Sequence, residues 1–314
     1  MYLGVAARLG ETCVALCDRG GHVIQEWNQL ESIGVDLSTV ETAICYTQER
    51  QQDLQEWAAQ LNSAWLTSWP DAALAGAFSG QPGVLLSTEH WTMYGGCACK
   101  NGPEPICQAL AMAREANHRT LAMAHGEGGL EWLSREALRL LEEVSGPSQH
   151  RLQHSLGALR GELNEMVPMR QRALAVRTHL EDLADYPGPD PASLAVLAKA
   201  GRRLSDLLRR LTARVRLNNP TRAAWLDGRL QGPLWQAMQV EFERYLPELH
   251  WQPAQAGPAV GAARLALGAR KEAERRALNP AVQLPVENDQ GGIRNLDADA
   301  WRQLSRHKFT RPKT

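Results

Sequence analysis

The pattern of hydrophobic and polar positions opens with short runs of β-forming residues. The first three runs cover residues 2–8, 12–18 and 22–27. Arg19-Gly20-Gly21 separates the last two runs, and paired glycines tolerate the positive φ angles of a tight hairpin turn. This pattern predicts an antiparallel three-stranded meander at the start of the chain.

Strand-like and helical spacing then alternate up to about residue 95. Further strands are expected at 40–47, 64–67 and 84–87, and helices at 51–62 and 71–78. Beyond this point the pattern becomes mostly helical, with helices expected at 104–117, 131–144, 149–182 and 192–216. The change of pattern predicts a mixed N-terminal lobe over residues 1–95, followed by a lobe of different character.

The last third of the chain returns to an α/β pattern and then becomes polar. Strands are expected at 222–226 and 250–252, and helices at 233–245 and 257–269. From residue 271 onward the sequence is polar and interrupted by Pro280 and Pro285, which predicts a mostly irregular tail. The organisation expected is therefore α/β, with a lobe at 1–95, a helix-rich lobe at 96–270 and a tail at 271–314.

Composition and charge narrow the classes of function. The chain has 314 residues, with 34 Lys and Arg against 35 Asp and Glu, which disfavours a surface built throughout for nucleic acid or anionic membrane. No apolar run reaches the ~18–20 residues of a membrane helix, and the N-terminus lacks the pattern of a signal peptide. We therefore expect a cytoplasmic protein, and its six cysteines are expected to be reduced.

Three local patterns each have a functional and a structural interpretation. Cys97, Cys99 and Cys107 form a C-x-C-x7-C pattern, but packed thiols explain it better than a metal or iron-sulfur site, and His150 and His154 lack a third ligand. Seven basic residues crowd the helix expected at 192–216, which is typical of a solvated face but also fits a phosphate-binding or nucleic-acid-binding face. No metal site is predicted.

Five segments, in order along residues 1–270, carry a resemblance to a known family. They read MYLGV…TCVALCDRGGHVI, DAALAGAFSGQPGVLLS…YGG, GEGGLEWLSREALRLL, AAWLDGRLQGPLWQAM and PAQAGPAVGAARLAL. Together they resemble the BadF/BadG/BcrA/BcrD-type ATPase and N-acetylglucosamine kinase family. The resemblance implies the two-lobed actin-like ATPase fold of the sugar kinases, which is ribonuclease H-like, with Mg-ATP as cofactor if the protein is active.

The chain departs from this family where the family handles phosphate. An Asp-Gly-Gly-Gly-Thr loop is replaced by residues 6–10, Ala-Ala-Arg-Leu-Gly, and a Gly-Thr-Gly-Ser loop by residues 88–91, Thr-Glu-His-Trp. An Asn-Asp pair that supplies the base is replaced by Ser68-Trp69, and a Gly-Gly pair near the adenosine by Asp227-Gly228. An acidic group that organises Mg²⁺ and glycines that expose backbone donors are thus lost.

The resemblance and its departures together favour a degenerate member of the family. We expect a pseudokinase that acts as a scaffold, assembly or regulatory subunit with a protein partner, either itself or an intact relative, and no bound cofactor. The alternative is an ATP-dependent kinase of N-acetylglucosamine or a related amino sugar, and a third possibility is a module that binds a small sugar or other metabolite.

The residues that these alternatives imply fall into three sets. Asp71 would be the catalytic base if the protein is active, and Glu127 and Gly128 would lie near the substrate. The remnants of the ATP loops are Gly10, Thr12, Thr88 and Gly228. Trp69 and Trp91 are expected close to the cleft between the lobes, where they would block it.

Overall fold

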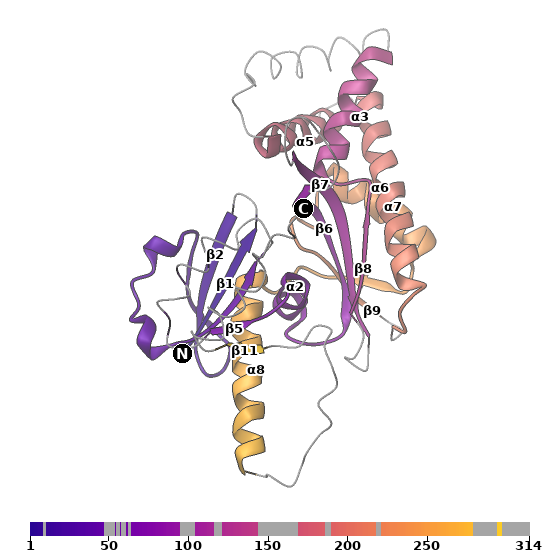
Figure 1. Ribbon diagram of the computed structural model, residues 1–314. Coiled ribbons are helices and arrows are strands. Elements are labelled where there is room, and N and C mark those ends of the chain that lie inside the picture. The colour runs from indigo at the N-terminus through magenta and orange to yellow at the C-terminus, as the bar shows by residue number, and fades with distance from the viewer. Residues whose placement is uncertain are drawn as a thin grey trace, which may run out of the picture. The chain divides into compact units, whose positions relative to one another are not determined.

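The computed structural model describes residues 1–8, 11–46, 54, 57, 61, 64–94, 104–115, 121–143, 169–185, 190–217, 221–278 and 294–296. The chain forms two compact units. Unit 1 comprises Met1–Gln81 together with Ala254–Thr314, and unit 2 comprises Pro82–Pro253. Each unit is built around its own mixed β-sheet (Figure 1).

Unit 1 contains a six-stranded sheet in the order β11-β5-β4-β1-β2-β3. Its strands are β1 (Tyr2–Arg8), β2 (Glu11–Cys17), β3 (Val23–Trp27), β4 (Glu41–Tyr46), β5 (Ala64–Leu66) and β11 (Arg294–Leu296). The short 3₁₀ turns η1 (Leu30–Ser32) and η2 (Leu37–Thr39) connect β3 to β4. The first three strands form the predicted antiparallel meander, whereas β1, β4 and β5 run parallel.

In unit 1, helix α8 (Pro258–Leu278) packs on this sheet and helix α2 (Trp69–Phe78) packs on α8, in both cases through glycine (Figure 1). A methyl group added at Gly4 of β1 would lie 1.9 Å from the carbonyl oxygen of Ala259, and one at Gly261 of α8 would lie 1.8 Å from that of Ala72. Only glycine allows backbones to approach this closely. This contact explains why α8, far away in sequence, belongs to the N-terminal unit.

Unit 2 contains a five-stranded sheet in the order β10-β9-β6-β7-β8. Its strands are β6 (Gly83–Tyr94), β7 (Glu104–Arg114), β8 (Leu121–Gly126), β9 (Thr221–Trp225) and β10 (Leu249–Trp251), and its helices are α3 (Leu130–Glu143), α5 (Met169–Asp185), α6 (Pro191–Thr212) and α7 (Pro233–Tyr245). Strands β6, β7 and β8 are antiparallel, and β6, β9 and β10 are parallel. The alanines of β7 and all leucines of α6 from Leu197 onward lie in one buried core.

Several expectations from the sequence are wrong. Residues 104–117, expected as a helix, include strand β7, and the chain from 121 to 126 forms strand β8, which the pattern did not predict. The closing helix continues to Leu278, and β11 pairs with β5, so the segment after residue 270 is less irregular than expected. Most of the helix expected at 51–62, and 149–168 of the helix expected at 149–182, lie outside the described residues.

The division into units differs from the lobes expected at 1–95 and 96–270. Strand β6 pairs with β7 along most of its length and with β9 over Val84–Leu86, and so belongs to unit 2, which places the division after Gln81. Among the described residues, no helix combines the length and the apolar character needed to cross a membrane.

Candidate functional site

The end of β1 lies where the resemblance to the kinase family places the first phosphate-binding loop. Ala6 and Ala7 are still within the strand, and Ala7 pairs with Thr12 of β2 on one side and with Tyr46 of β4 on the other. The ladder with β2 continues to Arg8 opposite Glu11, so the hairpin connection is two residues long. A central strand uses its backbone N–H groups in its two ladders, so Ala6 and Ala7 offer no row of donors to a phosphate. Gly10 lies outside the described residues.

Strand β6 carries a bulge where the second phosphate loop was expected. Its pairing with β7 shifts register between Ser87 and His90, which leaves Thr88 and Glu89 without partners in the ladder. A bulge frees backbone N–H groups from the sheet, and these donors are available to an anion.

The carboxylate of Asp227 occupies these donors. Its Oδ2 accepts hydrogen bonds from the backbone nitrogens of Thr88 at 2.5 Å and Glu89 at 2.7 Å. The hydroxyl of Ser87 donates to both carboxylate oxygens at 2.9 Å. An anion of the chain itself therefore sits where the bulge exposes two N–H groups and a hydroxyl.

The indole of Trp225 also contacts the β6 bulge. Its Nε1 donates to Thr88 Oγ1 at 3.1 Å, and the side chain is buried. A methyl group added at Gly228 would lie 2.1 Å from the indole ring. Gly228 is the one glycine that remains of the Gly-Gly pair expected near the adenosine, and here it leaves room for the Trp225 indole.

Glu89 is buried but paired. Arg177 of α5 approaches its carboxylate at 3.3 Å, contacts Glu181 at 3.1 Å, and lies over the Trp225 ring at 5.4 Å from its centroid. A guanidinium that stacks on an indole and bridges two carboxylates is held in place by several weak interactions. Charged and aromatic groups around the β6 bulge therefore contact one another in a single network.

Asp71, the residue proposed as a displaced catalytic base, lies in the first turn of α2 and is buried. Ser68 is the N-cap: its Oγ accepts a hydrogen bond from the Asp71 backbone nitrogen at 3.1 Å and donates to Asp71 Oδ2 at 2.5 Å. Ser68 thus caps the helix and also binds the Asp71 carboxylate, so Asp71 has a structural role that explains its position. Its catalytic role stays a prediction.

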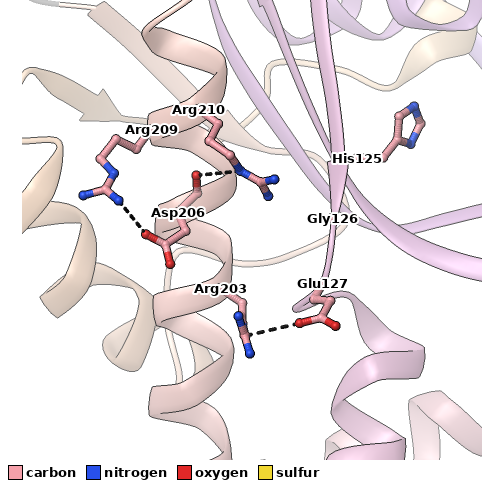
Figure 2. A pocket seen from close by; sticks show the side chains of 7 residues that line it. All are labelled: His125, Gly126, Glu127, Arg203, Asp206, Arg209 and Arg210. Carbon is pink, nitrogen blue, oxygen red and sulfur yellow. Dashed lines mark hydrogen bonds and ion pairs between the residues drawn. The ribbon is translucent and has the colours of Figure 1, made fainter.

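Glu127 and Gly128 follow β8 at the entrance to α3. Glu127 is exposed, and its carboxylate lies 3.2 Å from Nε of Arg203 on α6 (Figure 2). Gly128 has a φ of 99°, which favours glycine and turns the chain toward α3. The turn interpretation is thus supported, and contact with a substrate stays a prediction.

The thiol of Cys107 is buried in β7 and contacts the carbonyl oxygen of Thr88 at 3.6 Å. Burial raises the pKa of this thiol to about 12, so it is protonated and unreactive at neutral pH. Within the described ranges no three His, Cys, Asp or Glu side chains gather as a metal site would require. Cys97, Cys99, His150 and His154 lie outside these ranges.

The two tryptophans expected near a cleft belong to different units. Trp69 is buried in the first turn of α2 in unit 1, and Trp91 lies in β6 of unit 2, opposite Cys107. Their expected closeness to a cleft stays a prediction.

Asp227 is a residue of the candidate site whose partners the sequence does not reveal. In the sequence it stands as a substitution in a Gly-Gly pair, whereas its carboxylate reaches residues about 140 positions earlier. An Asp-Gly pair directly after a buried strand signals a turn, and nothing in the spacing identifies the partner of its side chain.

Comparison with known proteins places the fold. No family model and no curated sequence matches the chain. A candidate N-acetylglucosamine kinase from Chromobacterium violaceum is similar in structure, with a TM-score of 0.58, 17% identity, and coverage of 84% of this chain and 98% of that chain. A candidate N-acetylglucosamine kinase from Porphyromonas gingivalis gives a TM-score of 0.57 at 12% identity, with 86% and 100% covered. A glucokinase of the ROK family from Streptomyces griseus, in complex with glucose and AMPPNP, gives 0.53 at 13%, with 84% and 98% covered.

The chain has the actin-like ATPase fold of the sugar kinases. The resemblance in the sequence implies Mg-ATP as the cofactor if the protein is active. Taken separately, neither β1 nor the β6 bulge fits a phosphate of that cofactor. In unit 1, Ala6 and Ala7 provide no carboxylate and β1 pairs on both sides in the sheet. In unit 2, Asp227 binds the backbone N–H groups of the β6 bulge. The N–H groups of Thr88 and Glu89 are thus hydrogen-bonded within the chain.

Proposed function

We propose that this protein is a pseudokinase: a sugar-kinase fold that does not transfer phosphate and acts as a scaffold, assembly or regulatory subunit. The observation that carries the proposal is the Asp227 carboxylate bound to Ser87, Thr88 and Glu89. A nucleotide phosphate at these donors would have to displace a carboxylate that is already hydrogen-bonded, and the two anions would repel each other.

A protein without phosphotransfer acts through its surfaces, and β3 is the surface that supports association best. It is the edge strand of the sheet in unit 1, and among the described residues it pairs on one side alone, with β2. Val23 and Ile24 are exposed on it, at 43% and 54%. An edge strand with exposed apolar side chains is a template for pairing with another strand. The proposed partner is a second copy of this chain, joined through β3.

The association is tested by light scattering at tens of micromolar protein. We expect a dimer for the wild type and a monomer for Ile24→Lys, because a buried lysine opposes an interface of the ~1,000 Å² that stable association needs. Val240→Lys is the matched control, since Val240 is 63% exposed on α7 and far from β3 in sequence. A wild-type monomer, or equal loss in both variants, would contradict pairing through β3.

The alternative function is an ATP-dependent kinase of N-acetylglucosamine, which the structurally similar candidate kinases favour. Purified protein is incubated with Mg-ATP labelled at the γ-phosphate and N-acetylglucosamine, with the Streptomyces griseus glucokinase and glucose as positive control. We expect no transfer above the background and no difference between wild type and Asp71→Ala. Transfer that Asp71→Ala abolishes would establish the kinase in place of the pseudokinase, and sugar binding without transfer would support a metabolite-binding module.

A further inference from the structure

A cavity of about 430 Å³ lies in unit 2 between the end of β8 and the middle of α6 (Figure 2). The charged residues that line it are Glu127, Arg203, Asp206, Arg209 and Arg210. Three guanidinium groups against two carboxylates leave an excess positive charge in the lining. His125 also borders the cavity, but its ring points to the opposite side of β8 from the arginines. The cavity is therefore a small, positively charged recess with polar walls.

Arg210 is oriented by the groups around it. Its Nε donates to the backbone oxygen of Asp206 at 3.3 Å, one turn earlier in the helix. A methyl group added at Gly126 would lie 3.3 Å from Arg210 Nη2 and 3.1 Å from a methyl carbon of Leu207, which is fully buried. The guanidinium thus lies against bare backbone of β8, and among the described residues no carboxylate forms an ion pair with it. Its terminal nitrogens are available to a ligand.

The other two guanidinium groups form exposed ion pairs, and that of Arg209 also lies over the Tyr245 ring, 5.9 Å from its centroid. Arg203 pairs with Glu127 at 3.2 Å and Arg209 with Asp206 at 3.1 Å, and all four side chains are about half exposed (Figure 2). Pairs of this kind contribute little net stability and are screened by salt. A ligand with greater charge than a carboxylate can therefore recruit Arg203 at small cost.

Arg203 and Arg210 lie on one face of α6. Seven residues separate them, which is two helical turns or about 10.5 Å along the axis. Their long side chains border the same cavity from both turns. Planar guanidinium groups bind phosphate oxygens through paired hydrogen bonds, which a compact ammonium group cannot reproduce.

We propose that this cavity binds the phosphate group of a small hydroxylated molecule, such as a sugar phosphate, between Arg203 and Arg210. The carboxylate of Glu127 then accepts hydrogen bonds from the hydroxyl groups of the ligand. Glu127 and Asp206 would repel the continuous charge of a nucleic acid, so the basic face of α6 fits a small phosphate ester better than a polyanion. The site lies within unit 2 and does not depend on whether the protein binds ATP.

The test is calorimetric titration of the full-length protein with three probes: glucose 6-phosphate, inorganic phosphate and glucose. We expect binding of both phosphate-bearing probes and none of glucose. Arg203→Gln/Arg210→Gln should weaken this binding by about tenfold or more, because each arginine forms charge-assisted hydrogen bonds. Glu127→Gln should tighten binding of inorganic phosphate, because it removes the carboxylate that competes for Arg203.

The matched control is Arg202→Gln, which removes the same charge from an exposed position of α6 that does not line the cavity. We expect its affinities to equal those of the wild type. Tighter binding of glucose 6-phosphate than of inorganic phosphate identifies a phosphate ester as the ligand, and equal affinities identify free phosphate. Absence of binding at millimolar concentration, unchanged affinity in the double variant, or an equal loss in Arg202→Gln would overturn the proposal.

Discussion

Replacing Asp227 by alanine removes the acceptor of the three donors at the β6 bulge that lie within 2.9 Å of its carboxylate. The backbone nitrogens of Thr88 and Glu89 and the hydroxyl of Ser87 would lose their partner, and the residues that carry them are buried. A hydrogen bond to a charged acceptor contributes about 1.5–3 kcal/mol, and an unsatisfied buried donor costs about 1–3 kcal/mol. Because the Asp227 side chain is only partly buried, we take about 1 kcal/mol for each donor and expect a loss of roughly 3 kcal/mol in the free energy of unfolding.

The assay is urea unfolding of wild type and variants followed by circular dichroism. Asp227→Asn should cost about 1 kcal/mol, since an amide oxygen still accepts from the two backbone nitrogens. Asp206→Ala is the matched control, because its carboxylate forms one exposed ion pair with Arg209, and its loss should cost less than about 1 kcal/mol. If Asp227→Ala were no more destabilising than Asp206→Ala, the carboxylate would not satisfy the bulge and the reasoning would be refuted.

Three further predictions concern other parts of unit 2. A hydrogen bond from Arg139, followed by one from Lys199, lowers the pKa of Glu136 from 4.5 to about 2. The stability that this carboxylate contributes is complete above pH 4.5 and is lost as the pH falls through about 2. Glu136→Gln should therefore lower the free energy of unfolding by about 1 kcal/mol at pH 7 and by clearly less at pH 2, in urea titrations at both values. Cys107, whose thiol pKa is raised to about 12, should resist alkylation by iodoacetamide at pH 8 in the folded protein, while exposed Cys13 reacts. Peptide mass spectrometry measures the labelling of each cysteine, and equal labelling of the two would contradict the burial of Cys107. Gly228→Ala should lower the midpoint of thermal unfolding, because the added methyl group must displace an indole at a cost of about 1–3 kcal/mol, and an unchanged midpoint would contradict this packing.

The sequence predicted the elements whose pattern is local. The meander of β1, β2 and β3 follows from alternation and paired glycines, and α2, α3, α6 and α7 follow from helical spacing. Strand β7 could not be predicted, because its sequence, EPICQALAMAR, is rich in helix-forming Ala, Leu and Met. Pairing with β6 and β8 on both sides overrides this preference, and a short apolar run does not distinguish a buried strand from a helix.

From the sequence, the candidate site could be predicted only as a set of departures from the family's phosphate-binding motifs. The sequence showed that glycines and an aspartate expected at the phosphate loops are missing, but it gave no sign that β1 pairs through Ala7 or that β6 bulges at Thr88 and Glu89. The contact between Asp227 and this bulge joins residues distant in sequence, and no periodicity encodes such a contact. Asp71 was noted as a carboxylate, whereas its contact with the N-cap Ser68 is a local pattern that the sequence did contain.

The most direct test of the central claim is a calorimetric titration of the purified wild-type protein with Mg-ATP, alongside the Streptomyces griseus glucokinase as positive control. The donors of the β6 bulge are bound to Asp227 and those of β1 to the sheet, so we predict no measurable heat of binding at millimolar nucleotide. Micromolar binding that requires Mg²⁺ would contradict the account, because it would show that a nucleotide phosphate finds donors that the structure assigns to the chain itself.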